Sequence, residues 1–324
     1  MDSTRIGNTC LNLNLALDYR NRYAMKQLIK KISNKLLYHT RWFRNYWGGV
    51  QKFWNLREFN LDVVNLGSNS GKFDFDYSEV PLSGMDWAVG PQSLLHDYNI
   101  LKNYFSYLKD GATILIVITP FSSLFSPYTK ESNLKYYTSL HPATILDFDD
   151  SERTRALKIR DYPLKEIPSY CIKQTIKEVI GMVSYHKMKK CNFEEHALSF
   201  INMWRRQFGI NNFEVIPSAK HLMEQESRAK TLSEMIDFCL ERGFNPVLVV
   251  PPIYKSLADK LTPICRQNYM YNFIEKANSK KIRFLDYIDD ERFQEEEYFV
   301  NSFFMSARGA KLFTRTLLHE IGLI

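Results

Sequence analysis

A glycine- and serine-rich turn offers the most chemistry in this sequence. It reads Asn65-Leu66-Gly67-Ser68-Asn69-Ser70-Gly71 and follows a short β-branched run. Small residues at such a turn let backbone amides converge on a bound oxygen or phosphate. Ser68 and Ser70 are candidate nucleophiles, and Gly67 and Asn69 are candidate substrate-binding positions. The pattern is typical of two classes of site, a serine esterase or acyltransferase and a nucleotide or S-adenosylmethionine site.

A serine nucleophile needs a general base, which is most often a histidine. The histidines away from the chain ends are His96, His141, His186, His196 and His221. We take His141 as the candidate base, because Ser139-Leu140-His141-Pro142 belongs to a long insertion that can fold over the strand ends. The alternative interpretation is a loop histidine that is stiffened by the proline after it.

The elements that must position this turn are short strands alternating with helices. Apolar runs predict strands at 61–66, 112–118, 246–250 and 281–287, and helical patterns cover 93–108, 231–241, 262–279 and 305–321. Strands that are apolar throughout and alternate with helices indicate a parallel sheet covered on both faces. Ligands bind such sheets beyond the carboxyl ends of the strands, so we expect the site in the loops after Leu66, Ile118 and Val250.

Two further regions flank or interrupt this α/β domain, which we place at 61–324. Residues 1–60 are predicted to be a basic, mostly helical N-terminal extension, rich in Trp and Tyr towards its end. Residues 123–230 are far longer than an ordinary connection and are predicted to be a helical insertion, a cap with helices at 172–188 and 194–208. The extension either packs an apolar stripe on the sheet or makes a peripheral contact with an anionic membrane surface.

Composition narrows the class of protein. With 324 residues, 45% of them hydrophobic, the chain can bury a substantial core, and no apolar run reaches the length of a membrane span. We therefore expect a cytoplasmic protein, with the inner face of the membrane as the alternative. A net charge of +7 without a recognisable binding motif argues against a nucleic-acid partner.

Metal and cofactor sites are not expected. The five cysteines are scattered and lack metal-ligand spacing, so they are interpreted as reduced thiols. Asp74, Asp76 and Glu79 alternate after the turn in a way that would suit a metal, but a solvated acidic loop is the simpler interpretation.

Two segments resemble blocks of the SGNH/GDSL hydrolase superfamily. The run from Val63 to Ser70 resembles its first block, which ends in Gly-Asp-Ser or Gly-Ser-Ser, the last serine being the nucleophile. The run from Asn301 to Ala310 resembles its last block, which reads Asp-x-x-His and continues to Gly-Ala before the C-terminal helix. The resemblance implies a three-layer, flavodoxin-like α/β fold with a parallel sheet.

The catalytic positions of these blocks hold other residues here. Asn69 occupies the nucleophile position, Asn301 the acid position and Phe304 the base position, and none can perform the usual chemistry. A shift of one residue makes Ser68 or Ser70 the nucleophile. The remaining positions expected to bind substrate are Gly90, with an amide for an oxyanion, Gln92, Ser122 and Ser302. Asn301 and Phe304 are expected to face the same site across the sheet edge and to shape it without transferring a proton.

The segment from Asp86 to Ser122 is similar to SGNH-like proteins of bacterial capsule and surface-polysaccharide gene clusters. The resemblance implies an esterase or O-acyltransferase acting on an acylated carbohydrate. A catalytically degenerate pseudoenzyme that binds a glycan or acylated ligand is the first alternative. The second is a Rossmann-like methyltransferase, because Leu108-Lys109-Asp110-Gly111-Ala112-Thr113 resembles the Leu-Lys-x-Gly-Gly turn of that class.

Overall fold

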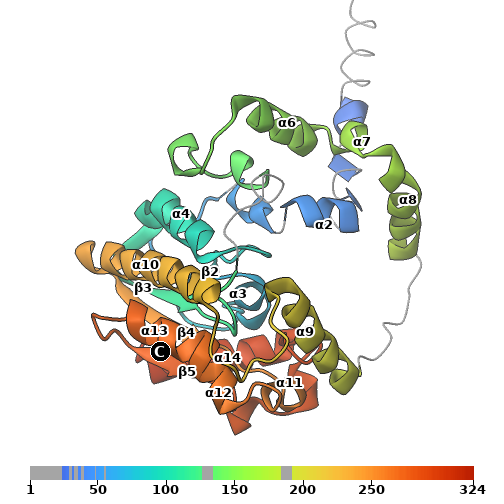
Figure 1. Cartoon of the computed structure of the whole chain (residues 1–324). Helices are drawn as coiled ribbons and strands as arrows, with labels where there is room; N and C mark the ends of the chain where they lie inside the picture. Colours follow the sequence, from blue (N-terminus) through green and yellow to red (C-terminus); the bar gives the residue numbers. More distant parts are fainter. Residues whose placement is uncertain are drawn as a thin grey trace, which may run out of the picture. The chain divides into compact units, whose positions relative to one another are not determined.

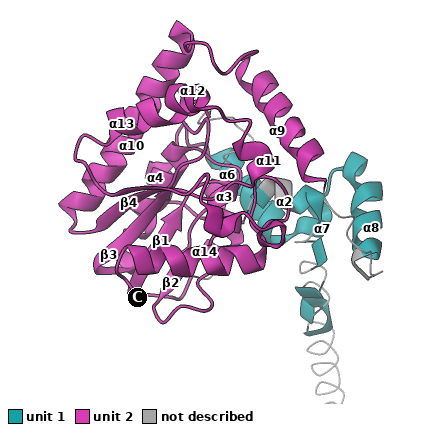
Figure 2. Ribbon diagram, turned by 90° about the horizontal axis from the view of Figure 1, so that it is seen from below, with its two compact units in different colours: residues 1–47, 150–187 teal, residues 48–149, 188–324 magenta. Residues whose placement is uncertain are grey.

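The computed structural model describes residues 24–28, 31–32, 36–37, 40–47, 49–54, 56–125, 134–183 and 192–324. The chain divides into two compact units, which Figure 2 colours separately. Unit 1 comprises residues 1–47 and 150–187, and unit 2 comprises residues 48–149 and 188–324. Part of the predicted insertion therefore groups with the N-terminal extension, and its remainder groups with the sheet.

Unit 2 is built on one parallel sheet. Its strands are β1 (Leu61–Leu66), β2 (Gly84–Asp86), β3 (Leu108–Val117), β4 (Asn245–Val250) and β5 (Phe284–Asp286). Their order is β2-β1-β3-β4-β5, and every neighbouring pair is parallel. The central strands are rich in Val, Ile and Leu, which suit a sheet buried on both faces. The predicted parallel α/β fold is confirmed.

Helices cover the two faces of the sheet (Figure 1). The helices α4 (Leu94–Tyr104), α10 (Ala219–Glu241) and α13 (Asn272–Ala277) pack together on one face, with α10 against β4. The helices α3 (Asn69–Asp74) and α14 (Ala307–Glu320) pack together on the other. Val63, Leu115, Val117 and Val249 share one buried cluster with Phe313 of α14, because alternate residues of each strand face the same side. The three-layer arrangement is confirmed.

Some boundaries differ from those predicted. β2 was not predicted, because it has three residues and only Met85 is apolar. β3 begins at Leu108 and contains Gly111 at φ 73°, where the pairing with β1 shifts register. The expected turn before this strand is therefore a bulge inside it. The predicted helix 262–279 is α12 (Pro263–Arg266), a π-helical segment (Gln267–Tyr271) and α13 in succession.

Unit 1 is helical in the residues described. It contains α2 (Arg41–Trp47), α6 (Asp150–Asp161), α7 (Pro163–Glu166) and α8 (Ser169–Val183). α6 contacts α7, and α2 contacts α8. The Arg41 amide donates a hydrogen bond of 2.7 Å to Glu178 Oε2, which ties the start of α2 to α8. The buried side chains include Trp42, Phe43 and Trp47.

Candidate functional site

A cavity of about 390 Å³ opens at the carboxyl end of the sheet in unit 2. Its lining residues are Ser68, Asn69, Ser70, Pro91, Thr119, Pro120, Phe125, Phe200, Met203, Trp204, Gln207, Phe303 and Phe304. The strand order places β1 beside β3 at the point where the connections change direction, which is the usual ligand position in such sheets. The loops after β1 and β3 contribute to the cavity as predicted, whereas the loop after β4 does not.

One wall of the cavity is aromatic. The helix α9 (Phe193–Phe208) supplies Phe200 and Trp204, and the segment before α14 supplies Phe303 and Phe304. The ring centroids of Phe200 and Phe303 lie 5.0 Å apart, and those of Phe303 and Phe304 lie 4.9 Å apart. These rings hold one another in place, so the wall is formed before any ligand arrives.

The turn after β1 supplies Ser68, Asn69 and Ser70 to the lining, and glycine is required at two positions, Gly67 in this turn and Gly90 after β2. Gly67 has φ 139°, and a Cβ on it would lie 2.9 Å from Val117 Cβ. A Cβ on Gly90 would lie 1.7 Å from Asn69 Oδ1. Gly90 thus leaves room for the Asn69 side chain, but Gly90 itself does not line the cavity.

Ser68 and Asn69 present polar groups to the cavity. The Ser68 hydroxyl oxygen accepts a hydrogen bond of 3.1 Å from the backbone N–H of Gln92. Within the described part of the chain, the Asn69 side chain forms no hydrogen bond, although it is only half-buried and faces the cavity. The Asn69 side-chain amide can therefore hydrogen-bond a ligand without breaking a hydrogen bond within the protein.

Ser70 lines the cavity but is almost fully buried beside Asp74. Burial raises the pKa of Asp74 well above its usual value, against the opposing effects of the Met305 amide and the Ser70 hydroxyl. The Met305 amide donates to Asp74 Oδ1 at 2.9 Å. Asp74 is fully buried and already accepts the Met305 amide, so we interpret it as a structural group of the core.

Behind the turn lies a polar cluster that the sequence analysis did not single out. Asp97 accepts hydrogen bonds from the Gly67 amide, at 2.7 Å, and from the side chain of Gln92. Gln92 also donates to the Gly67 carbonyl at 2.8 Å and accepts from the Tyr136 hydroxyl at 2.8 Å. Lys135 donates to the carbonyl of Pro91. Gln92 is thus a support for the turn and not part of the larger cavity's lining.

Two members of this cluster have strongly shifted pKa values. Burial raises the pKa of Asp97 to about 7, although the hydrogen bonds from Gly67 and Gln92 act in the opposite direction. Burial lowers the pKa of Lys135 to about 7, and the charge of Lys72 lowers it further. Asp97 was detectable in the sequence, because it follows Leu94 by three residues and precedes Leu101 by four on the apolar side of a helix.

A second, small cavity of about 20 Å³ connects Ser68 to this cluster. It is lined by Ser68, Gln92, Ser93, Leu94, Asp97, Val117, Thr119, Ser122 and Phe125. A space of this size is large enough for one water molecule. Ser122 belongs to this small cavity, where its hydroxyl oxygen accepts from the Thr119 amide at 2.9 Å, and not to the larger one.

The segment from Asn301 to Ala310, which resembles the last SGNH block, contributes mainly to the shape of the cavity. Asn301 Oδ1 accepts hydrogen bonds from the amides of Phe303 and Phe304, both at 2.9 Å. Ser302 is fully buried, and its hydroxyl lies 2.8 Å from His196 Nδ1. Of these predicted residues, only Phe304 reaches the cavity, where it lies near Phe73 with ring centroids 5.2 Å apart.

The structure does not bring the candidate base to the serines. His141 is exposed and precedes the short helix Pro142–Thr144, where its Nδ1 accepts from the Ala143 amide at 3.2 Å. Among the residues that the structure describes, no histidine lines the larger cavity. His196 contacts Phe200, whose ring does line it, and burial lowers the pKa of His196.

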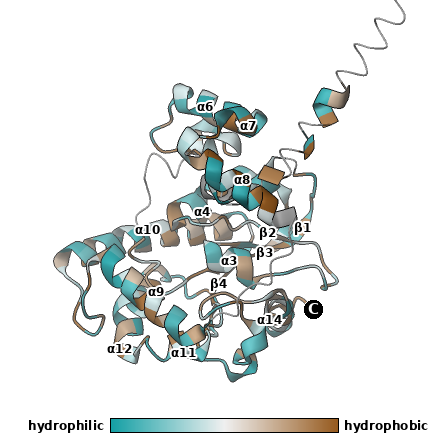
Figure 3. Cartoon of the chain, turned by 90° about the vertical axis from the view of Figure 1, so that its right-hand side faces the viewer, coloured by the Kyte–Doolittle hydropathy of each residue, from teal (hydrophilic) through white to brown (hydrophobic). Residues whose placement is uncertain are grey.

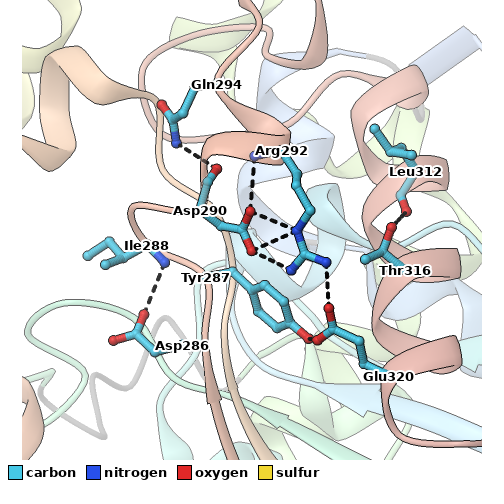
Figure 4. A network of polar contacts seen from close by, with 9 residues as sticks. All are labelled: Asp286, Tyr287, Ile288, Asp290, Arg292, Gln294, Leu312, Thr316 and Glu320. Carbon is cyan, nitrogen blue, oxygen red and sulfur yellow. Dashed lines mark hydrogen bonds and ion pairs between the residues drawn. The ribbon is translucent and has the colours of Figure 1, made fainter.

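A polar network fixes the segment that leads into the last block (Figure 4). Arg292 pairs with Asp290 at 2.5 Å and with Glu320 of α14 at 2.6 Å. The Tyr287 hydroxyl donates to Glu320 at 2.5 Å. Burial raises the pKa of Glu320, but the hydrogen bonds from Tyr287 and Arg292 outweigh it, so the pKa is lowered overall. The chain after β5 is therefore anchored to α14.

The acidic residues after the turn bind different groups and do not converge on one point. Asp76 Oδ1 accepts from the Ser78 amide at 2.9 Å, and Glu79 pairs with Lys311 at 2.6 Å. In the described ranges, no three His, Cys, Asp or Glu side chains are grouped as metal ligands. Over the same ranges, no helix is long and apolar enough to cross a bilayer.

Neither a scan against protein-family models nor a search of curated proteins gave a match.

Proposed function

We propose that unit 2 is an SGNH-like domain that binds the acyl-bearing part of an acylated carbohydrate without cleaving it. The observation that carries the proposal is the single cavity that Ser68, Asn69 and Phe304 line together. A proton acceptor would be needed where Phe304 stands, and a phenyl ring accepts none. The frame of a hydrolase site is retained in this proposal, and its proton-transfer groups are replaced.

The chemistry of the two walls favours this class of ligand. An aromatic wall of Phe200, Trp204 and Phe303 suits an acyl group or the apolar face of a sugar. The Asn69 amide can donate to an ester carbonyl without giving up a bond within the protein. A mostly apolar pocket with few polar groups is the usual form of a small-molecule site.

Two buried cysteines, Cys239 and Cys265, are free thiols, which agrees with a cytoplasmic setting.

The test is calorimetric titration with an O-acetylated methyl glycoside and with the same glycoside deacetylated. We expect the acetylated form to bind more tightly. The near-isosteric Asn69→Leu should weaken its binding by about 3- to 10-fold, the effect of losing one hydrogen bond. The exposed Asn272→Leu on α13 is the matched control and should bind like the parent. Equal affinity for both glycosides, or no effect of Asn69→Leu, would overturn the proposal.

A second candidate, acyl hydrolysis or transfer through Ser68, is favoured by the water-sized cavity that Ser68 shares with Asp97. In this mechanism the Ser68 oxygen attacks the acyl carbonyl while its proton passes through the water to the Asp97 carboxylate. Collapse of the adduct expels the sugar alkoxide, which takes the proton back from Asp97. A second water or an acceptor alcohol then attacks the acyl carbonyl and gives its proton to Asp97, and that proton returns to the Ser68 oxygen as the acyl product leaves.

The two candidates differ in turnover. Hydrolysis of a p-nitrophenyl acyl ester that is lost in both Ser68→Ala and Asp97→Asn, and that rises with pH around 7, would establish the second candidate. Binding of the acetylated glycoside without such turnover would support the first. Ser279→Ala is the control, because Ser279 is exposed and lies outside both cavities, so the variant should not affect turnover in either case.

A further inference from the structure

Unit 1 exposes an apolar helix face. In α8, Ile172, Ile176 and Ile180 follow one another at intervals of four residues, so they lie on one side of the helix. Their exposed fractions are 44%, 53% and 59%. Thr175 and Glu178 lie on another side, where Thr175 is buried and Glu178 accepts the hydrogen bond from Arg41. Figure 3 shows hydrophilic and hydrophobic positions mixed along α8, as this pattern requires.

The same unit carries the positive charge of the protein. Its residues include 17 Lys and Arg against 7 Asp and Glu, a net charge of +10. The whole chain is +7, so the residues of unit 2 carry a net charge of −3. On α8 itself, the exposed Lys173 and Lys177 each follow an exposed isoleucine. The apolar face therefore lies on the basic unit and is bordered by lysines.

A second group of exposed apolar side chains belongs to the same unit. Met25, Leu28 and Ile32 are all exposed and recur at helical spacing in the N-terminal segment. Lys26 and Lys31 are interspersed with them and are exposed as well. Apolar side chains flanked by lysines on a basic unit have the composition of a helix lying in a membrane interface.

We infer that unit 1 docks peripherally on an anionic lipid surface, with Ile172, Ile176 and Ile180 of α8 entering the interface. The positive charge of the unit, including the lysines beside the isoleucines, complements acidic headgroups, and this electrostatic attraction is strongest at low salt. A neutral apolar partner would explain the isoleucines but not the concentration of positive charge in this unit. The inference does not depend on the ligand that unit 2 binds.

The experiment is flotation of the full chain with vesicles of phosphatidylcholine alone or mixed with phosphatidylglycerol. We expect binding to the mixed vesicles only, weakened by added salt. The double variant Ile172→Gln/Ile176→Gln should bind at least about tenfold more weakly, because two apolar side chains no longer leave water. The matched control is Ile216→Gln/Ile264→Gln, which changes two exposed isoleucines of unit 2 and should bind like the parent.

Circular dichroism of each variant confirms that it is folded. Binding that is equal for both vesicle types, absent from both, or unchanged by the double variant would overturn the inference. So would a dimer in sedimentation equilibrium that the double variant abolishes, since a second copy of the chain would then cover the face.

Discussion

The ionisation of Asp97 should make the stability of unit 2 depend on pH in a way that one substitution removes. The folded-state pKa is about 7, whereas the usual value is 3.8. Between these two values the folded state binds a proton that the unfolded state has lost. The free energy of unfolding therefore falls as pH rises, by about 1.4 kcal/mol per pH unit. The stabilisation is fully present below about pH 4 and is lost once the pH passes about 7.

The size of the effect follows from the gap of about three pKa units. It amounts to about 4 kcal/mol over the whole window, and to about 2 kcal/mol between pH 5 and 7, because the folded state is itself half deprotonated at pH 7. Asp97→Asn removes the titration and keeps an oxygen that can accept from the Gly67 amide. The variant should therefore gain stability relative to the parent as the pH rises from about 5 to about 7, and the difference should then level off.

The measurement is urea unfolding of parent and variant at about pH 5, 6, 7 and 8. Hydrogen exchange of peptides from β1 and β3 identifies the transition that belongs to unit 2. The exposed Asp259→Asn is the control, and its curve should run parallel to that of the parent. A constant difference between parent and Asp97→Asn over this range would refute the reasoning, because it would mean that Asp97 titrates alike in the folded and unfolded states.

Two further predictions concern the turn and the C-terminal segment. Gly90→Ala should lower ligand affinity and cost about 1–3 kcal/mol of stability, because the new Cβ displaces the Asn69 side chain. The control is Gly181→Ala in α8, where a Cβ meets open space. Scanning calorimetry should show this variant to be as stable as the parent or more stable. Arg292→Ala should cost no more than about 1 kcal/mol in urea unfolding, because the arginine is half-exposed, but should speed hydrogen exchange near Glu320 at the end of α14.

The fold was predictable where the sequence contains long apolar runs. β1 and β4 match the runs that predicted them, because strands buried on both faces are rich in apolar residues. β2 was missed because it contains no apolar run. Its backbone pairing with β1 alone makes it a strand. The bulge at Gly111 was taken for a turn because a glycine with positive φ serves both structures.

The division into two units could not be predicted from the sequence. It depends on helices such as α2 and α8, which lie far apart in the chain and meet through contacts that no local pattern encodes. The predicted boundaries followed changes in composition, which mark where an insertion begins but not what it packs against. The basic character of the N-terminal extension was visible, whereas its association with residues 150–187 was not.

The candidate site was predictable where residues follow strand ends. Ser68, Asn69 and Ser70 lie at the end of β1 and line the cavity together with Phe304, which the last block brings to the same edge. Asp97 was missed because a carboxylate within an apolar helix face was not treated as a signal. The position of His141 was unpredictable, since the insertion offers many ways to fold over the strand ends.

The hydrogen bonds of Asn301 decide where any catalytic base would have to stand. Its side-chain oxygen already accepts two backbone amides, which uses both lone pairs and fixes the loop that presents Phe304. A histidine at position 304 would find no free acceptor on Asn301 to orient its ring, so Phe304→His alone should not create a base. If Ser68 acts as a nucleophile, as in the second candidate function, the acceptor for its proton is therefore expected to be Asp97, which lines the same water-sized cavity.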